Sequence, residues 1–457
     1  MHVDAVVYLN DVLYEQFSES EALQQLCAAA TLPGVVQRVI GMPDIHTGFG
    51  LPIGGVMATH AESGIVSAGA VGMDINCGVR LIRTDIPCTA INKKTLRALM
   101  EAIEERIPTG IGKRSRHREL GKTEIEAILH QGVKPLLQLG YGWPTDQDCI
   151  EEAGEMPGAD LKAVSLEAIS RANQLATIGG GNHFIEIGQV AQIFDPELAA
   201  NFGLKKGALT VLIHTGSRGF GHQICTDYSK KMLNAAARYG INLPNRGLAS
   251  VPINSPEGQT YLKAMACAVN FAFANRQLIT HDIREAFAHV FADSAESLGL
   301  QIVYDVAHNI AKFEEHHGQR LLIHRKGATR ALPAGHQQNP RRYLATGHPA
   351  IVPGSMGTSS YVLVGTPLTA ETFNSVNHGA GRILSRTAAR KEISCEDFAR
   401  SMGEILLNVR QYQELLDEAP AAYKNIDHVV DTLAEISLTK KVARLEPLAV
   451  IKGEGED

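Results

Sequence analysis

Two residues of types that bind metal ions stand three positions apart in the stretch Ala70–Arg80. Asp74 and Cys77 are flanked by Gly72 and Gly78, and a strand-like apolar run, 79–84, follows. A turn bounded by glycines can aim a carboxylate and a thiol at one point, as a metal site requires. The same stretch, taken alone, also fits a polar turn with a small buried cysteine, so the interpretation depends on further ligands elsewhere.

Three histidines downstream stand where an apolar strand begins or ends. They are His183 in Gly179–Ile187, His214 in Leu212–His222 and His308 in Val303–Asn309. A single histidine in such a place is more often structural than a ligand. Together with Asp74 and Cys77 they make five candidate ligands, one more than a tetrahedral zinc site takes. The set therefore predicts two divalent ions with Cys77 bridging, and the ligand types allow Mn(II), Zn(II) or Co(II).

The segment around His183 also predicts a second ligand. In a strand, alternate side chains face opposite ways, so Asn182, Phe184 and Glu186 would share one face and His183 the other. Such a strand can serve a metal on one side and a second molecule on the other.

The segment Asn377–Arg386 favours phosphoryl chemistry. If it is helical, His378, Arg382 and Arg386 are spaced i, i+4, i+8 and share one face, where a nucleophilic imidazole would lie beside two phosphate-binding guanidiniums. The alternative is an exposed basic helix face, although Gly379 and Gly381 would be costly there. Two further segments fit a nucleotide: the Gly-flanked Ser355 in Pro353–Thr358, and Lys452 at the end of an apolar strand.

The segment Gly112–Arg118 is the strongest basic cluster in the chain. It is not a phosphate-binding P-loop, because position 107 is Ile where that motif has Gly. The two interpretations are a solvated loop and a contact to a polyanion such as RNA.

The elements that must position these residues alternate along the chain. Strands are predicted at 3–9, 35–41, 79–84, around 185, at 210–214, 302–305 and 361–364, and helices at 20–30, 92–106, 123–139, 160–176, 228–238 and 259–290. The Gly- and Pro-rich stretch 41–55 carries Asp44 and His46 and would bend sharply or approach a ligand. No repeat, low-complexity linker or Rossmann fingerprint divides the chain. We therefore expect one large mixed α+β domain over residues 1–457.

Bulk composition narrows the class of protein. The chain is 44% apolar with a formal net charge of −6 and a pI near 6.3, which argues against a generally basic nucleic-acid binder. Its seven cysteines are scattered without CxxC pairs, which favours a reducing compartment over a disulfide framework. No basic leader and no run of 18 apolar residues is present. We expect a cytoplasmic protein without a membrane partner.

At this point a family resemblance becomes clear. The motifs Asp74-x-x-Cys77, Gly-Gly-Gly-Asn182-His183-Phe-x-Glu186, His214-Thr-Gly-Ser-Arg218-Gly, His308-Asn309, Pro-Gly-Ser355-Met-Gly and His378-Gly-Ala-Gly-Arg382 resemble the RtcB family of RNA-splicing ligases. The resemblance runs from residue 1 to Lys452. It implies an α+β fold largely peculiar to the family. It also implies a GTP- and Mn(II)-dependent ligase that joins an RNA 3′-phosphate or 2′,3′-cyclic phosphate to a 5′-hydroxyl.

The resemblance also implies roles for particular residues. His378 would become covalently guanylylated, and the five candidate ligands would hold two manganese ions. The residues expected around the guanine nucleotide are Asn182, Phe184, Glu186, His308, Asn309, Pro353, Gly354, Ser355, Met356, His378, Gly379, Ala380, Gly381, Arg382, Tyr423 and Lys452. The residues expected to contact RNA are Lys113, Arg114, Arg116, Arg118, Arg218 and Arg386.

The expected partners are tRNA halves or damaged RNA, together with an archease-type activator. Two alternatives remain open from the residues alone. One is a dinuclear metal-dependent phosphodiesterase or nuclease, which the metal ligands would allow. The other is a non-catalytic RNA-binding protein, which would need neither Cys77 nor His378.

Overall fold

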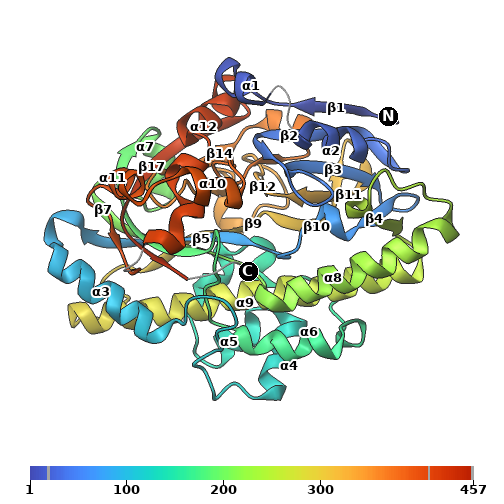
Figure 1. The fold of residues 1–457 in the computed structure, drawn as a ribbon. Coiled ribbons are helices and arrows are strands. Elements are labelled where there is room, and N and C mark those ends of the chain that lie inside the picture. Colours follow the sequence, from blue (N-terminus) through green and yellow to red (C-terminus); the bar gives the residue numbers. More distant parts are fainter. Residues whose placement is uncertain (18–20, 410–411, 454–457) are drawn as a thin grey trace.

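A sheet of eight strands, antiparallel except for the pairing of one short strand, forms the centre of the protein. The computed structural model describes residues 1–17, 21–409 and 412–453 (Figure 1). Seven of the strands follow the order β13 (Pro349–Val352), β14 (Ser360–Gly365), β17 (Thr439–Lys452), β6 (Phe184–Ile193), β7 (Ala208–Thr215), β5 (Gly78–Pro87) and β9 (Gln301–Ala307). The short β16 (Leu406–Leu407) pairs in parallel with β17. Strands distant in sequence thus become neighbours.

Both faces of this sheet are buried, because alternate side chains enter two different cores. Ile185 and Ile187 of β6 pack with α3 (Lys93–Arg106) and α9 (Pro256–Phe291). Phe184 faces the other way, toward α10 (Arg386–Glu392), α11 (Cys395–Met402) and the 3₁₀ helix η11 (Tyr412–Glu418). Figure 1 shows α3 and α9 on one side of the strands and α10 and α11 on the other.

A second sheet meets the first at His308. Its order is β1 (Asp4–Val7), β2 (Val35–His46), β3 (Ile53–His60), β11 (Gln319–Lys326) and β10 (Asn309–His316), with β1 and β2 parallel. Helices α1 (Asp11–Phe17) and α2 (Glu21–Ala29) precede β2, and α12 (Ile426–Glu435) packs on β2. Two short pairs complete the strands: β4 (Ile65–Ser67) with β8 (Ser250–Pro252), and β12 (Ala328–Arg330) with β15 (Ser375–Asn377). Because β9 runs into β10 through His308, this residue lies where the two sheets join.

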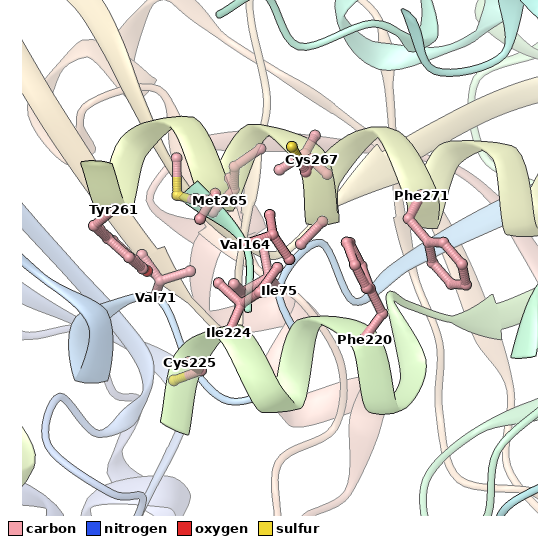
Figure 2. Close-up of a cluster of buried hydrophobic side chains, with 14 of the residues drawn as sticks. Val71, Ile75, Val164, Phe220, Ile224, Cys225, Tyr261, Met265, Cys267 and Phe271 are labelled. Carbon is pink, nitrogen blue, oxygen red and sulfur yellow. The ribbon is translucent and has the colours of Figure 1, made fainter. Parts of the chain in front are cut away.

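The turn that carries Asp74 is held in a core between α8 (Arg218–Ala235) and α9 (Figure 2). Val71 and Ile75, on either side of Asp74, are fully buried there. They pack among Phe220 and Ile224 of α8 and aromatic side chains of α9 such as Phe271. Burying these apolar neighbours fixes the backbone of the turn, so the carboxylate between them has a defined direction.

Most predicted elements are confirmed, with longer or shifted bounds. The prediction for 20–30 corresponds to α2, and its first residue, Ser20, lies outside the described residues. The prediction for 228–238 corresponds to α8, which starts earlier, at Arg218. The predicted helix 123–139 is wrong as a single helix, because it splits into α4 (Lys122–Gln131) and α5 (Lys134–Gln138) at Gly132, whose φ is +61°. The predicted helix 160–176 is also wrong: α6 (Leu166–Ser170) and 3₁₀ turns replace it.

The predicted helix over Asn377–Arg386 is wrong as well, and this correction concerns the site. β15 ends at Asn377, and α10 begins at Arg386 after a cap by Ser385. The segment between them is a loop in which Gly381 has a φ of +75°. A Cβ atom at Gly381 would lie 2.2 Å from the Asp44 carbonyl oxygen, so the glycine serves a close backbone approach. His378 and Arg382 are therefore positioned by a loop, and not by a shared helix face.

The chain is a single mixed α/β domain without a Rossmann or P-loop arrangement, as predicted. Within the described residues, no helix combines the length and apolarity needed to cross a bilayer.

Candidate active site

Neighbouring strand ends at one edge of the large sheet carry the predicted metal ligands. His183 precedes β6, His214 lies near the end of β7, Cys77 precedes β5, and His308 follows β9. These strands are adjacent and antiparallel, so the start of one lies beside the end of the next. Lys452, the last residue of β17, lies on the same edge. Strand order alone therefore gathers residues that are up to 375 positions apart, from Cys77 to Lys452.

Distances within the cluster confirm that the five side chains converge. The Cys77 Sγ atom lies 3.3 Å from His183 Nε2 and 3.4 Å from His214 Nε2. His214 Nε2 lies 3.4 Å from His308 Nε2, and Asp74 Oδ2 lies 3.0 Å from His183 Nε2. The ligand atoms form two sets of three within 4.8 Å that share the cysteine: Asp74, Cys77, His183 and Cys77, His214, His308.

The protonation of the side chains in this cluster suits a site that binds two cations. Burial raises the pKa of the Cys77 thiol to about 11, so a metal-binding thiolate needs a cation beside it. Burial also holds the pKa values of His214 and His308 well below the usual range, so both imidazoles are neutral, the form that binds metal. Among the described residues, the Nδ1 atoms of both rings have no hydrogen-bond partner, while the two Nε2 atoms lie 3.4 Å apart.

One arginine of α9 connects three of the ligand segments. Arg276 is fully buried and donates to the carbonyl oxygen of Asn76 at 3.0 Å and to that of Thr215 at 2.8 Å. It also forms an ion pair with Asp305 at 2.8 Å. Asn76 lies between Asp74 and Cys77 with a φ of 54°, and its side chain donates to the Val269 carbonyl of α9. The helix thus fixes the turn before β5 and the ends of β7 and β9.

His378 is oriented by Asp44 of β2. The Asp44 Oδ2 atom lies 2.6 Å from His378 Nδ1 and also accepts from the backbone N–H groups of His378 and Gly379. Burial opposes ionisation of Asp44, but contacts with His378 outweigh it and hold the pKa of this carboxyl below its usual value. Because an ionised carboxylate only accepts hydrogen bonds, Nδ1 of His378 carries a proton, and in the neutral form of the ring Nε2 is the nitrogen with the free lone pair. The His378 ring lies beside His308, with centroids 4.8 Å apart.

A second group of side chains surrounds the buried carboxylate of Glu418. Arg382 donates to Glu418 at 3.2 Å, and the Tyr423 hydroxyl donates to its other oxygen at 2.5 Å. Lys452 Nζ lies 3.7 Å from Glu418 and 5.7 Å from the ring centre of Phe184. Phe184 in turn lies edge-on to His214, at 5.5 Å between centroids. Cationic and aromatic groups are therefore fixed beside the metal cluster on the His183 and His214 side.

A cavity of about 760 Å³ unites these groups. Its walls include the five metal-type residues and all the residues predicted around the nucleotide except Glu186. Glu186 is 1% exposed, two residues beyond Phe184 on the same face of β6, and one of its carboxyl oxygens has no partner. Burial raises the pKa of Glu186 to about 8. Its predicted contact with a guanine base remains a prediction.

The residues predicted to contact RNA do not form one surface. Lys113, Arg114, Arg116 and Arg118 are exposed in a loop outside the cavity. His117 ties this loop to Asp282 of α9 at 3.0 Å. Arg386 lies in the cavity wall. The prediction for Arg218 does not fit its position, because this side chain is 1% exposed and donates inward to Thr177 and the Gly110 carbonyl.

Four positioning residues were not identified from the sequence. The sequence marks Asp44 only as part of a glycine-rich stretch and does not indicate its contact with His378. The sequence gives no signal for Glu418, Arg276 and Lys326, because each resembles an ordinary charged residue. Only the fold brings Glu418 and Lys326 to the cavity and Arg276 to the segments of the candidate metal ligands.

Comparison with known proteins agrees with this geometry. A family model described as "tRNA-splicing ligase RtcB" matches residues 25–453. A protein of Thermococcus kodakarensis named tRNA-splicing ligase RtcB is 45% identical over 99% of this chain and 95% of its own length. Its counterpart of the same name in Methanococcus maripaludis is also 45% identical, over the same shares. The RNA-splicing ligase RtcB of Mycobacterium tuberculosis is 43% identical over 94% of this chain and all of its own.

Proposed function

The chain belongs to the RtcB family of tRNA-splicing ligases, and we propose that it joins RNA 3′-phosphate or 2′,3′-cyclic phosphate ends to 5′-hydroxyl ends through a guanylylated His378. Membership of this family makes it an RNA ligase that acts in tRNA splicing. The GTP and manganese dependence, the chemistry of the ends and the residue roles are parts of the proposal.

The observation that carries the proposal is the contact between Asp44 and His378. With its Nδ1 proton held by Asp44, His378 presents an unprotonated Nε2 as nucleophile. Nε2 attacks the α-phosphorus of GTP, an N–P bond forms, and the bond to the pyrophosphate oxygen breaks. The positive charge that develops on the imidazole is stabilised by the adjacent carboxylate.

The side chains around Glu418 suit the bound nucleotide. Arg382 and Lys452 supply positive charge, and Phe184 and Tyr423 supply aromatic surface for a guanine base. Glu418 orients three of these groups. Glu186 would accept from the guanine N1 and N2 donors, which adenine does not offer as a pair.

The two three-residue sets that share Cys77 would hold two Mn(II) ions. Bound there, the ions would supply Lewis acidity that withdraws charge from phosphate oxygens. The ligand types also allow Zn(II) or Co(II). The metal content of protein purified in the presence of each ion shows which ion binds.

Two transfers complete the reaction. An oxygen of the RNA 3′-phosphate attacks the guanylyl phosphorus, the N–P bond to His378 breaks, and RNA ends in a 3′-phosphate joined to GMP. The 5′-hydroxyl of the second RNA then attacks the 3′-phosphorus, loses its proton, and GMP leaves. A cyclic end must first be hydrolysed to the 3′-phosphate. The substrates would be tRNA halves or damaged RNA, and an archease-type activator would support repeated turnover.

A dinuclear phosphodiesterase would need the metal ligands but not the arrangement at His378. Such an enzyme has no use for a buried carboxylate that fixes one tautomer of a fourth histidine beside the metal cluster. The ligase accounts for both parts of the cavity.

Mass spectrometry after incubation with GTP and Mn(II) tests the proposal. We expect an acid-labile gain of one guanylyl group that maps to His378. His378→Ala should lose the adduct and all joining from a plain 3′-phosphate, yet join RNA that already carries a 3′-phosphate-guanosine end. His289→Ala, which removes an exposed imidazole of α9, is the matched control. An adduct on another residue, or cleavage of RNA without joining, would overturn the proposal.

A further inference from the structure

Three exposed apolar side chains lie around the cavity and have no role in the proposed chemistry. Phe49, Met73 and Ile383 line the cavity with exposed fractions of 53%, 38% and 49%. Most of the remaining wall is made of imidazoles, cations, amides and glycines. Large apolar side chains exposed at a cavity are unfavourable in water, and a ligand that covers them removes this cost.

The Phe49 backbone is held rigidly between β2 and β3. The Gln25 side chain both accepts from the Gly48 N–H at 3.0 Å and donates to the Gly48 carbonyl at 2.6 Å. On the other side, Gly50 has a φ of +88°, and a Cβ atom there would lie 2.3 Å from the Gly247 carbonyl. The aromatic ring is therefore presented to solvent from a fixed backbone, which lowers the entropy cost of binding to it.

Lys326 ties this loop to the reacting groups. Its ammonium donates to the carbonyl of Phe49 and to that of Gly69 at 3.2 Å, where the turn toward Met73 and Asp74 begins. The next residue, Gly327, lies against His378, since a Cβ atom there would be 3.0 Å from His378 Cε1. A group resting on Phe49 is thus next to the Asp74 segment and the His378 loop.

This part of the cavity is separate from the part that suits the guanine nucleotide. The side chains around Glu418 adjoin His183 and His214 through Phe184 and Lys452. The Met73 turn instead adjoins Asp74 and Asn309, because Gly72 packs against Asn309, whose side chain donates to the Asp74 carbonyl at 3.1 Å. Lys326 joins the Phe49 carbonyl to the Gly69 carbonyl, where this turn begins. Two different ligands can therefore reach the metal cluster from two directions.

We propose that Phe49, with Met73 in the same cavity wall, stacks against the terminal nucleobase of an RNA end and holds that end over the metal cluster. The inference rests on the proposed function and deepens it, since it assigns a base-binding subsite to the RNA. Every base has a π face, so an aromatic platform binds RNA ends without sequence preference. Only an unpaired base exposes that face, so the protein prefers ends whose last nucleotide is single-stranded.

Substitution of Phe49 tests the subsite by comparing RNA joining, which needs RNA, with GMP adduct formation, which does not. Loss of one base–aromatic stack corresponds to about a 5- to 100-fold weaker interaction. Phe49→Ala should therefore raise KM for single-stranded RNA by about that factor, while the rate of GMP adduct formation from GTP alone stays unchanged. Phe49→Tyr should behave like the unmodified protein. Phe313→Ala is the matched control, because Phe313 is a 37%-exposed ring of β10 outside the cavity.

Abasic substrates identify the stacked end and separate this inference from the proposed function. Two RNAs are compared, one that lacks the base at the 3′-phosphate end and one that lacks the base at the 5′-hydroxyl end. Only the RNA without the stacked base should bind more weakly. With that RNA the Phe49→Ala effect should disappear, as in a double-mutant cycle. If Phe49→Ala keeps its full effect on both abasic RNAs, or has none on intact RNA, the subsite is wrong. If adduct formation and joining fail in the unmodified protein, the proposed function fails instead.

Discussion

The carboxylate of Asp44 lies 2.6 Å from Nδ1 of His378, although the two residues are 334 positions apart. The same oxygen accepts hydrogen bonds from two backbone N–H groups of the loop that carries the histidine. One atom of β2 thereby sets both the tautomer of the imidazole and the path of the main chain around it. In the proposed mechanism, the nucleophile is thus oriented before any nucleotide binds.

Asp44→Asn should slow adduct formation by about two to four orders of magnitude. The amide can donate as well as accept, so it no longer selects the tautomer with a free Nε2, and it carries no charge to stabilise the imidazolium. Rapid-quench measurement of GMP transfer to the protein checks this result. Asp85→Asn, at an exposed carboxylate of β5, should leave the rate unchanged. Equal rates in both variants would contradict the role given to Asp44.

Arg276→Met should lower metal affinity by about 10- to 100-fold, because the contacts that orient the ligand segments are lost. Titration calorimetry with Mn(II) measures the effect. Arg284→Met is the matched control: it removes another buried arginine of α9 and its ion pair with Asp146, away from the ligands. Both variants should lose about 3–5 kcal/mol of stability. Only Arg276→Met should lose metal, and equal losses in both would mean that Arg276 acts through stability alone.

Cys77→Ser should lose bound metal together with adduct formation and joining. A serine hydroxyl stays protonated at neutral pH and cannot bridge two cations as a thiolate does. Metal content per protein after dialysis is the direct measurement. Cys88→Ser, at a half-buried cysteine outside the cavity, should keep its metal. Normal metal content in Cys77→Ser would exclude the thiol as a ligand.

Glu186 should make the nucleotide-free protein less stable as pH rises. Burial raises the pKa of its carboxyl from 4.5 to about 8, so the folded protein keeps a proton that the unfolded chain has lost. Between these values the free energy of unfolding should fall by about 1.4 kcal/mol for each pH unit, and level off above pH 8. Urea unfolding from pH 5 to 9 should show this slope, and Glu186→Gln should remove it. Glu446→Gln, at an exposed carboxyl of β17, should keep it.

The gathering of the candidate metal ligands could be predicted from sequence because Cys77 and the three histidines lie at the ends of apolar strands, and antiparallel strands bring such ends together. Asp44 and Arg276 could not, because their roles depend on which segments pack against β2 and α9. The helix predicted over Asn377–Arg386 failed for a related reason. The i, i+4, i+8 spacing is helical, but Gly381 is needed for a close approach to Asp44, a contact from the other end of the chain.

Neutralising Lys113, Arg114, Arg116 and Arg118 together should weaken RNA binding and flatten its dependence on salt. These side chains are exposed, and His117 holds their loop against Asp282 of α9, so the charges stay near one place on the surface. Each phosphate contact that is lost should lower the slope of log K against log salt by about 0.7 for single-stranded RNA. Adduct formation from GTP should not change, because none of the four lines the cavity. Neutralising four other exposed basic residues, Lys93, Lys94 and Arg97 of α3 together with Lys206, controls for net charge. If both variants change the slope equally, the loop acts only through the overall charge of the protein and makes no specific contact with RNA.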